Sequence, residues 1–300
     1  MASRVHTEER VNVCLYGNEQ AGEGTSLDEI RRLIEKAGHR IDRIISHGED
    51  LSQASHESHE CLVAAGGDGT VARAGRALAH GRMPLAIVPL GTANNIAASL
   101  GINSDPERAI DAWKAQHVVR LDVGVVEDSH GRCLFIEGVG VGLLPAGIAI
   151  GRKAVPKNNG QDPSANVTKA RGIFLETLLT LEPRHYGLSI EGETFEDESL
   201  LVEVLNIASV GPRIRLSDEA NPADGLLSVV VAGPGDRELI ADHLRGRWDD
   251  DRRHAQLKTW RATRVEVRGW HDYHVDDEIR EADGNTVEIH IEPGALPVLA

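Results

Sequence analysis

The chain of 300 residues has few aromatic side chains, few cysteines and no long apolar run. Phe, Trp and Tyr make up only 3% of it, so the core must be built from Val, Leu, Ile and Ala. Cys14, Cys61 and Cys133 lie far apart in apolar segments, and an odd number without paired spacing disfavours a disulfide framework or a zinc site. No segment approaches the roughly 18 consecutive apolar residues of a membrane span.

Basic residues are also scarce relative to acidic ones. The chain has 32 Lys and Arg against 47 Asp and Glu, which gives a net charge of −15. Binding to nucleic acid needs clustered positive charge, so this composition argues against a nucleic-acid partner and against a broadly basic membrane-binding surface. Residues 1–10 are polar and lack the apolar segment of a secretory signal, so we expect a cytoplasmic protein.

The most informative segment is a glycine cluster around one carboxylate, Gly66-Gly67-Asp68-Gly69-Thr70. It follows the apolar run 61–65 and precedes a helical pattern, which predicts a buried strand, a tight turn and a helix N-terminus. Glycines leave the backbone N–H groups open to a polyphosphate, and the Asp would lie where a nucleotide or its magnesium ion is held. Taken alone, the turn is equally compatible with a simple connection between a strand and a helix of an α/β fold that binds no ligand.

A second strand-to-helix turn lies about 25 residues further along. The apolar run 85–89 leads into Leu90-Gly91-Thr92-Ala93-Asn94-Asn95, which places small hydroxyl and amide side chains where a ligand phosphate would lie. Two such turns at this spacing fit neighbouring turns at one edge of a parallel sheet, where α/β sheets bind ligands.

The domain organisation follows from a change in pattern near residue 120. Alternating strand and helix patterns predict a doubly wound α/β domain over residues 1–120. Short β-like runs separated by turn residues then predict a mainly antiparallel β-sandwich over residues 121–291. Residues 145–171 are polar and basic without a strong pattern, which favours a surface loop or lid, and a helix is expected over 173–181.

Together the two turns resemble the diacylglycerol kinase catalytic domain family, which includes sphingosine kinases and bacterial lipid kinases and shares a superfamily with NAD kinases. The resemblance implies ATP and Mg²⁺ as cofactors, and a final segment, residues 292–300 here, that returns to complete the first domain. The family's loop after the first strand carries Asn-Pro-x-Ser-Gly; Asn18 matches its first position, but the Pro and Ser are absent. The implied nucleotide-binding residues are Asn18, Gly66, Gly67, Asp68, Gly69, Thr70, Gly91, Thr92 and Asn94.

Two acidic motifs in the second domain also match the family. Its Asp-Gly-x-Leu segment shapes a structural metal loop, which implies Asp224 and Leu226 as metal ligands, although these residues alone predict only a turn into a strand. The family's Asp-Gly-Glu, whose Asp acts as general base on the acceptor hydroxyl, stands here as Asp276-Asp277-Glu278. The match implies Asp276 as the base, with Glu278 and Asp68 as the other catalytic residues, whereas charge alone would predict a solvated loop.

The resemblance implies a lipid kinase of phospholipid metabolism that transfers the γ-phosphate of ATP to the hydroxyl of diacylglycerol or a related lipid. A lipid acceptor implies transient contact at a membrane surface, and many members form homodimers. The departures at Asp277 and at Ala72-Arg73, where the family usually has Asn-Glu, keep open a nucleotide-binding regulator that transfers no phosphate. An NAD kinase-like enzyme is a third hypothesis, which the Gly91–Asn95 turn and the Asp224-Gly225 motif disfavour.

Overall fold

The computed structural model describes residues 10–18, 25–51, 54, 59–154, 163–247, 257–282 and 286–300. Its helices are α1 (Leu27–Lys36), α2 (Asp68–Leu78), α3 (Asn95–Ser99), α4 (Pro106–Ala112), α5 (Leu143–Ala154), α6 (Pro163–Thr180) and α7 (Arg237–Leu244). Its strands are β1 (Asn12–Gly17), β2 (Arg40–Ser46), β3 (Cys61–Gly66), β4 (Leu85–Pro89), β5 (Val118–Asp128), β6 (Gly131–Phe135), β7 (Gly138–Gly142), β8 (Arg184–Ile190), β9 (Glu193–Ser199), β10 (Leu201–Leu205), β11 (Ser209–Val210), β12 (Ile214–Arg215), β13 (Leu227–Ala232), β14 (Lys258–Ala262), β15 (Arg264–Arg268), β16 (Asp272–Val275), β17 (Glu278–Glu281) and β18 (Val287–Leu299).

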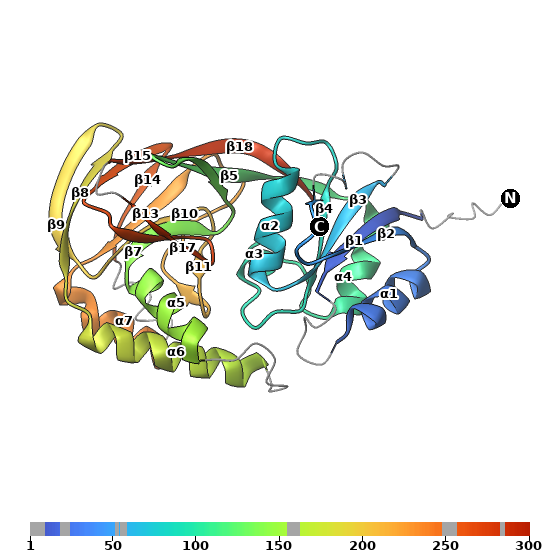
Figure 1. Cartoon of the computed structure of the whole chain (residues 1–300), viewed down its shortest axis with the longest axis horizontal. Coiled ribbons are helices and arrows are strands. Elements are labelled where there is room, and N and C mark those ends of the chain that lie inside the picture. The colour runs from blue at the N-terminus through green and yellow to red at the C-terminus, as the bar shows by residue number, and fades with distance from the viewer. Residues whose placement is uncertain are drawn as a thin grey trace, which may run out of the picture.

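The N-terminal half is built on four parallel strands in the order β2-β1-β3-β4, with α1 and α4 on one face and α2 and α3 on the other (Figure 1). Because helices cover both faces, β3 and β4 are buried along their whole length. Helix α1 begins at Leu27, where the Ser26 side chain accepts a hydrogen bond from the N–H of Glu29 and caps the helix. The predicted doubly wound α/β arrangement is confirmed.

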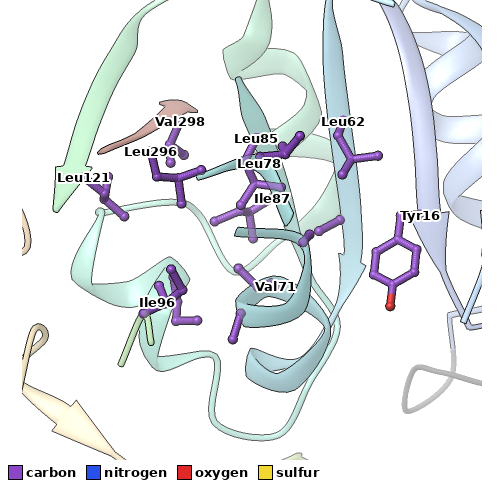
Figure 2. Close-up of a cluster of buried hydrophobic side chains, with 14 of the residues drawn as sticks. Tyr16, Leu62, Val71, Leu78, Leu85, Ile87, Ile96, Leu121, Leu296 and Val298 are labelled. Atoms are coloured by element: carbon purple, nitrogen blue, oxygen red, sulfur yellow. The ribbon is translucent and has the colours of Figure 1, made fainter. Parts of the chain in front are cut away.

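The core on the α2 face consists mainly of aliphatic side chains from distant parts of the chain, with Tyr16 at one side (Figure 2). Figure 2 shows Val71 and Leu78 of α2 among strand residues such as Ile87, with Leu296 and Val298 of the last strand beside them. Aliphatic packing of this kind matches the low aromatic content.

The N-terminal sheet continues into the second half of the chain. Strand β18 pairs in parallel with β4 at Val298 and Leu299 and antiparallel with β5 along most of its length. The sheet then runs on through β15, β8 and β9, so that ten strands form one sheet, in which β5 and β18 join the two halves (Figure 1). Strand β5 runs through residue 120 without interruption. The predicted domain boundary near this residue therefore stays a prediction.

The second half is a sandwich, as predicted. A six-stranded antiparallel sheet, β14-β13-β10-β7-β16-β17, packs against the β5, β6, β8, β15 and β18 part of the first sheet. The core between the two sheets contains Phe135, Val139, Val202, Trp270 and Ile289. This core fixes the β16–β17 hairpin, which carries the Asp276 motif.

The prediction of a surface loop or lid over residues 145–171 is wrong for the part of it that the structure describes, which is helical. Helix α6 begins at Pro163, whose fixed φ suits the first turn of a helix. Phe174 of α6 packs against Gly147 of α5, where an added Cβ would lie 2.5 Å from the aromatic ring. Phe174, Leu144 and Leu178 belong to one hydrophobic core, which also includes residues of β10 and β13. Within the described ranges, none of the helices combines the length and apolar character needed to cross a membrane.

Candidate active site

The Gly66–Thr70 turn links β3 to α2. Gly66 ends the strand, Gly67 is the N-cap and Asp68 is the first residue of the helix, so α2 begins within the glycine turn. A Cβ on Gly66 would lie 2.5 Å from the Oγ1 of Thr70, which leaves room only for glycine beneath the hydroxyl group.

The Gly91–Asn94 turn is closed by one amide side chain. Asn94 has a left-handed backbone with a φ of 53°. Its Oδ1 accepts a hydrogen bond from the N–H of Gly91 at 2.9 Å, and its Nδ2 donates to the Gly91 carbonyl at 2.7 Å. The two glycine turns are in contact, since a Cβ on Gly91 would lie 2.4 Å from the Cα of Gly67. They therefore form one backbone surface at the carboxyl ends of β3 and β4.

Asp68 connects the two turns. Its Oδ1 accepts a hydrogen bond from the N–H of Ile96 at 3.0 Å, at the beginning of α3. Burial raises the pKa of the Asp68 carboxyl, and hydrogen bonds from the N–H groups of Ile96 and its neighbours oppose that rise. Asn18 lies at the same sheet edge, because it follows Gly17, which pairs with Ala65 of β3.

Asp276 lies in the turn between β16 and β17, in a left-handed conformation with a φ of 51°. Its carboxylate is fully buried. The Oδ1 atom accepts hydrogen bonds from the N–H groups of Ile136 at 3.0 Å and Glu137 at 2.8 Å, and Oδ2 accepts one from Arg76 at 2.6 Å. Burial raises the pKa of Asp276, and the positive charge of Arg76 opposes the rise. A buried carboxyl group with a raised pKa beside a charged partner is a candidate acid or base.

Arg76 is a site residue that sequence reasoning missed. It lies on α2, two turns after Asp68, and its second nitrogen, Nη2, donates to the Oε1 of Glu278 at 2.9 Å. Burial alone would lower the pKa of Arg76, but the two carboxylates raise it. One guanidinium therefore ties the predicted catalytic residues Asp276 and Glu278 to the helix that follows the first glycine turn.

Asp277 faces the first glycine turn directly. A Cβ on Gly69 would lie 2.8 Å from the Oδ2 of Asp277, so this carboxylate occupies the space above the turn. Arg152 of α5 donates a hydrogen bond to the Asp277 carbonyl. The residue that replaces the family's glycine thus adds a negative charge beside the predicted phosphate site.

Glu137 is a second residue that sequence reasoning missed. It is 5% exposed, its N–H holds Asp276, and its own Oε1 has no hydrogen-bond partner among the described residues. Burial, followed by the negative charges of Asp68 and Asp276, raises the pKa of Glu137 well above its ordinary value. The predicted nucleotide and base residues therefore surround one buried carboxyl group, which only the tertiary structure reveals.

The alternating glycines of β7 make room for a buried ion pair behind Asp276. Glu203 of β10 and His274 of β16 are both opposite Gly140 in the sheet, and a Cβ on Gly140 would lie 2.3 Å from the Glu203 carboxyl. The His274 Nε2 lies 2.9 Å from Glu203, and its Nδ1 lies 2.8 Å from the Asp276 carbonyl. Because a carbonyl oxygen can only accept, the His274 Nδ1 donates to the backbone carbonyl of Asp276. Burial alone would lower the pKa of His274, but the neighbouring Glu203 raises it.

Asp224 and Leu226 are not part of this cluster. They lie in a loop before β13, where both interact with Arg261 of β14. Their role as metal ligands stays a prediction.

Two family models cover most of the chain. The diacylglycerol kinase catalytic domain matches residues 12–126, and the YegS C-terminal NAD kinase beta sandwich-like domain matches residues 154–300. The chain belongs to the diacylglycerol kinase catalytic domain family. Membership in this kinase family implies a phosphotransferase.

Individual relatives agree with this assignment. A diacylglycerol kinase of Mycobacterium tuberculosis is 24% identical over 249 residues, which are 80% of this chain and 79% of the relative. The crystal structure of a diacylglycerol kinase from Bacillus anthracis superimposes with a TM-score of 0.73 at 21% identity, over 96% of each chain. An NAD kinase from Archaeoglobus fulgidus in complex with ATP gives a TM-score of 0.52 at 11% identity, over 96% of this chain and 93% of that one. At these identities the structural likeness shows the shared fold.

Proposed function

We propose that the protein is an ATP-dependent lipid kinase that transfers the γ-phosphate to a lipid hydroxyl group, such as that of diacylglycerol. The observation that carries the proposal is the convergence of two glycine turns, Asp68 and the buried Asp276 at one place between the two halves of the chain. Phosphoryl transfer depends mainly on positioning and on charge stabilisation, and these groups supply both.

The phosphates of ATP would approach the backbone of the two glycine turns. A polyphosphate needs close approach to backbone N–H groups, and the contact between Gly67 and Gly91 leaves no Cβ in the way. Asp68 is the carboxylate at this surface that would hold a magnesium ion carried by the phosphates. When bound, that ion would neutralise charge on the transferred phosphoryl group.

Asp276 would act as the general base. An ionised carboxylate offers about four acceptor sites. Glu137 and Arg76 each fill one, and the N–H of Ile136 is shared between Oδ1 at 3.0 Å and Oδ2 at 3.3 Å. Because the carboxylate is buried, a lipid hydroxyl would reach Oδ2 only after a local shift of the groups around it, and Oδ2 would then accept the proton. The hydroxyl oxygen then forms a bond to the γ-phosphorus, the bond from that phosphorus to the bridging oxygen breaks, and ADP leaves.

A pocket of about 430 Å³ supports a lipid acceptor. Its wall includes Ile279 of the strand that follows Asp276 and the apolar residues Pro145 and Ala149 of α5, together with the charged residues Glu182, Arg184 and Asp272. The apolar side of this pocket would suit an acyl chain, and the charged side would suit the polar end of a lipid. Membrane contact and dimerisation stay predictions.

The position of the Asp277 carboxylate supports a second candidate function, that of a nucleotide-binding regulator that transfers no phosphate. Its position over Gly69 adds a like charge beside the phosphates, which would weaken binding of a nucleotide or slow transfer. Measurable ATP binding by calorimetry without transfer to any acceptor would support this candidate.

The direct test is transfer of labelled γ-phosphate from ATP to lipids in mixed micelles, including diacylglycerol, monoacylglycerol and a sphingoid base. We expect a labelled lipid product that Asp276→Asn reduces by at least about 100-fold. Glu281→Gln is the matched control, because Glu281 is an exposed carboxylate on the same hairpin. Equal activity of Asp276→Asn and the wild type would remove Asp276 from the mechanism.

A further inference from the structure

The loop that the family resemblance assigns to a structural metal already contains a cation, the guanidinium of Arg261. Arg261 lies on β14 opposite Ser228 of β13, and its side chain is 20% exposed. Its Nη2 donates to the Asp224 carboxylate at 2.5 Å and to the Leu226 carbonyl at 3.5 Å. Its Nη1 donates to the Glu219 carbonyl at 2.8 Å and to the Ser228 hydroxyl at 2.6 Å.

These acceptors form the set of oxygens that a divalent ion would use. One carboxylate, two carbonyls and one hydroxyl are the ligand types that Mg²⁺ and Ca²⁺ prefer. Asp224 and Leu226 are also the two predicted ligands, and one guanidinium binds both of them. Mg²⁺ needs its oxygens at about 2.0–2.1 Å, so an ion at these oxygens would have to displace Arg261 and compete with its charge.

A buried carboxylate at this loop, that of Asp122, is also satisfied within the chain. Asp122 is 2% exposed. Its Oδ2 accepts a hydrogen bond from the N–H of Gly225 at 2.6 Å, and its Oδ1 accepts one from the N–H of Gly294 at 2.7 Å. Both glycines have positive φ angles, of 75° and 60°, which aim these N–H groups at the carboxylate. Asp122 therefore anchors the loop to the sheet through two N–H groups, whereas Asp224 is paired with the Arg261 guanidinium.

We propose that Arg261 takes the place of the divalent metal in this loop, so that the second domain keeps its structure without a bound metal ion. A magnesium requirement of the protein would then come from its nucleotide. The inference does not depend on the proposed kinase activity, because it concerns the folded loop alone.

The test is thermal unfolding of the full chain without nucleotide, in excess EDTA and in millimolar Mg²⁺ or Ca²⁺. We expect the wild-type Tm to differ by less than about 1 °C between these conditions, since an ion that binds only the folded state would raise it. Arg261→Ala should lower the Tm by roughly 5 °C, because it leaves Asp224 without its partner. The ions should then raise the Tm of this variant, because the four oxygens become available.

The matched control is Lys258→Ala on the same strand, which removes an exposed ion pair with Asp197 and should change the Tm little. The inference fails if EDTA lowers the wild-type Tm, Mg²⁺ or Ca²⁺ restores it, and Asp224→Asn abolishes that response. A response that survives Asp224→Asn arises elsewhere in the protein and leaves the inference supported. If the ions affect neither the wild type nor Arg261→Ala, Arg261 does not stand in for a metal. Should Arg261→Ala not fold, the comparison of the wild type with Asp224→Asn decides alone.

Discussion

Replacement of Arg76 by Met tests how the site holds its buried base. Arg76 is the cation that contacts the Asp276 carboxylate, at 2.6 Å, and the two side chains are 18% and 0% exposed. Removing one partner of a buried ion pair typically costs about 3–5 kcal/mol because the other charge is left uncompensated. Since Arg76 keeps some contact with solvent, we expect the lower end, about 3 kcal/mol.

The loss of stability should depend on pH in a defined direction. Burial already raises the pKa of Asp276 and Arg76 opposes this, so the pKa rises further in the variant. A carboxyl group whose pKa is raised by folding favours the folded state at low pH and loses that contribution as the pH rises. The difference in unfolding free energy between wild type and Arg76→Met should therefore be larger near about pH 8 than near about pH 5.

The same change should impair phosphate transfer. A protonated Asp276 cannot accept the hydroxyl proton, so turnover at neutral pH should fall about 100-fold and the acid limb of the pH–rate profile should move to higher pH. Chemical denaturation at the two pH values and the pH–rate profile measure these effects. Arg73→Met, one turn earlier on α2, is the control, because the Arg73 guanidinium donates a hydrogen bond to the Glu49 carbonyl, whereas the contacts to Asp276 and Glu278 come from Arg76. Wild-type stability at both pH values with an unmoved pH profile would refute the role of Arg76 as counter-ion.

Three further substitutions test the geometry of the site. Gly91→Ala should weaken ATP binding at least about 10-fold in calorimetry, because its Cβ would lie 2.4 Å from the Cα of Gly67 and push the turns apart. Asp277→Gly should tighten ATP binding about fivefold, since it removes a like charge of roughly 1 kcal/mol from the phosphate site. Gly140→Ala should lower the Tm by roughly 5–10 °C, because its Cβ would lie 2.3 Å from the Glu203 carboxyl.

Each of these substitutions has a matched control or a clear contrary result. Gly151 in α5 and Gly172 in α6 have nothing within 4 Å of an added Cβ, so alanine there should leave ATP binding and the Tm unchanged or slightly improved. Unchanged ATP affinity in Gly91→Ala would mean that the nucleotide does not use the two turns. Weaker binding after Asp277→Gly would make that carboxylate a ligand of the nucleotide's metal instead of a repulsive charge.

The two glycine turns and the two-layered second half could be predicted from the sequence because their signals are local. Apolar runs that end in glycine clusters specify strand, turn and helix within ten or so residues. Arg76 and Glu137 could not be predicted in the same way, because their contacts with Asp276 join residues that are 200 and 139 positions apart. Such pairings depend on how β16 and β7 lie against α2, which no local pattern encodes.

Helices α5 and the first part of α6 were missed for a different reason. Their basic side chains suggested a solvated loop, whereas Leu144 and Ile148, four residues apart, already carried a helical period that packs onto the sandwich. The Asp224 loop was predicted from a local motif, but its partner could not be predicted in the same way. Arg261, whose guanidinium contacts Asp224, is 37 positions away in the sequence.

The proposed phosphate-transfer site is formed by two glycine turns and a buried aspartate. Its test is labelled γ-phosphate transfer to the lipid panel by the wild type, Asp276→Asn and Glu281→Gln in parallel. We expect a chloroform-soluble labelled product from the wild type and from Glu281→Gln, and its loss in Asp276→Asn. ATP binding without a labelled product from any acceptor, or equal product from all three proteins, would contradict the proposal.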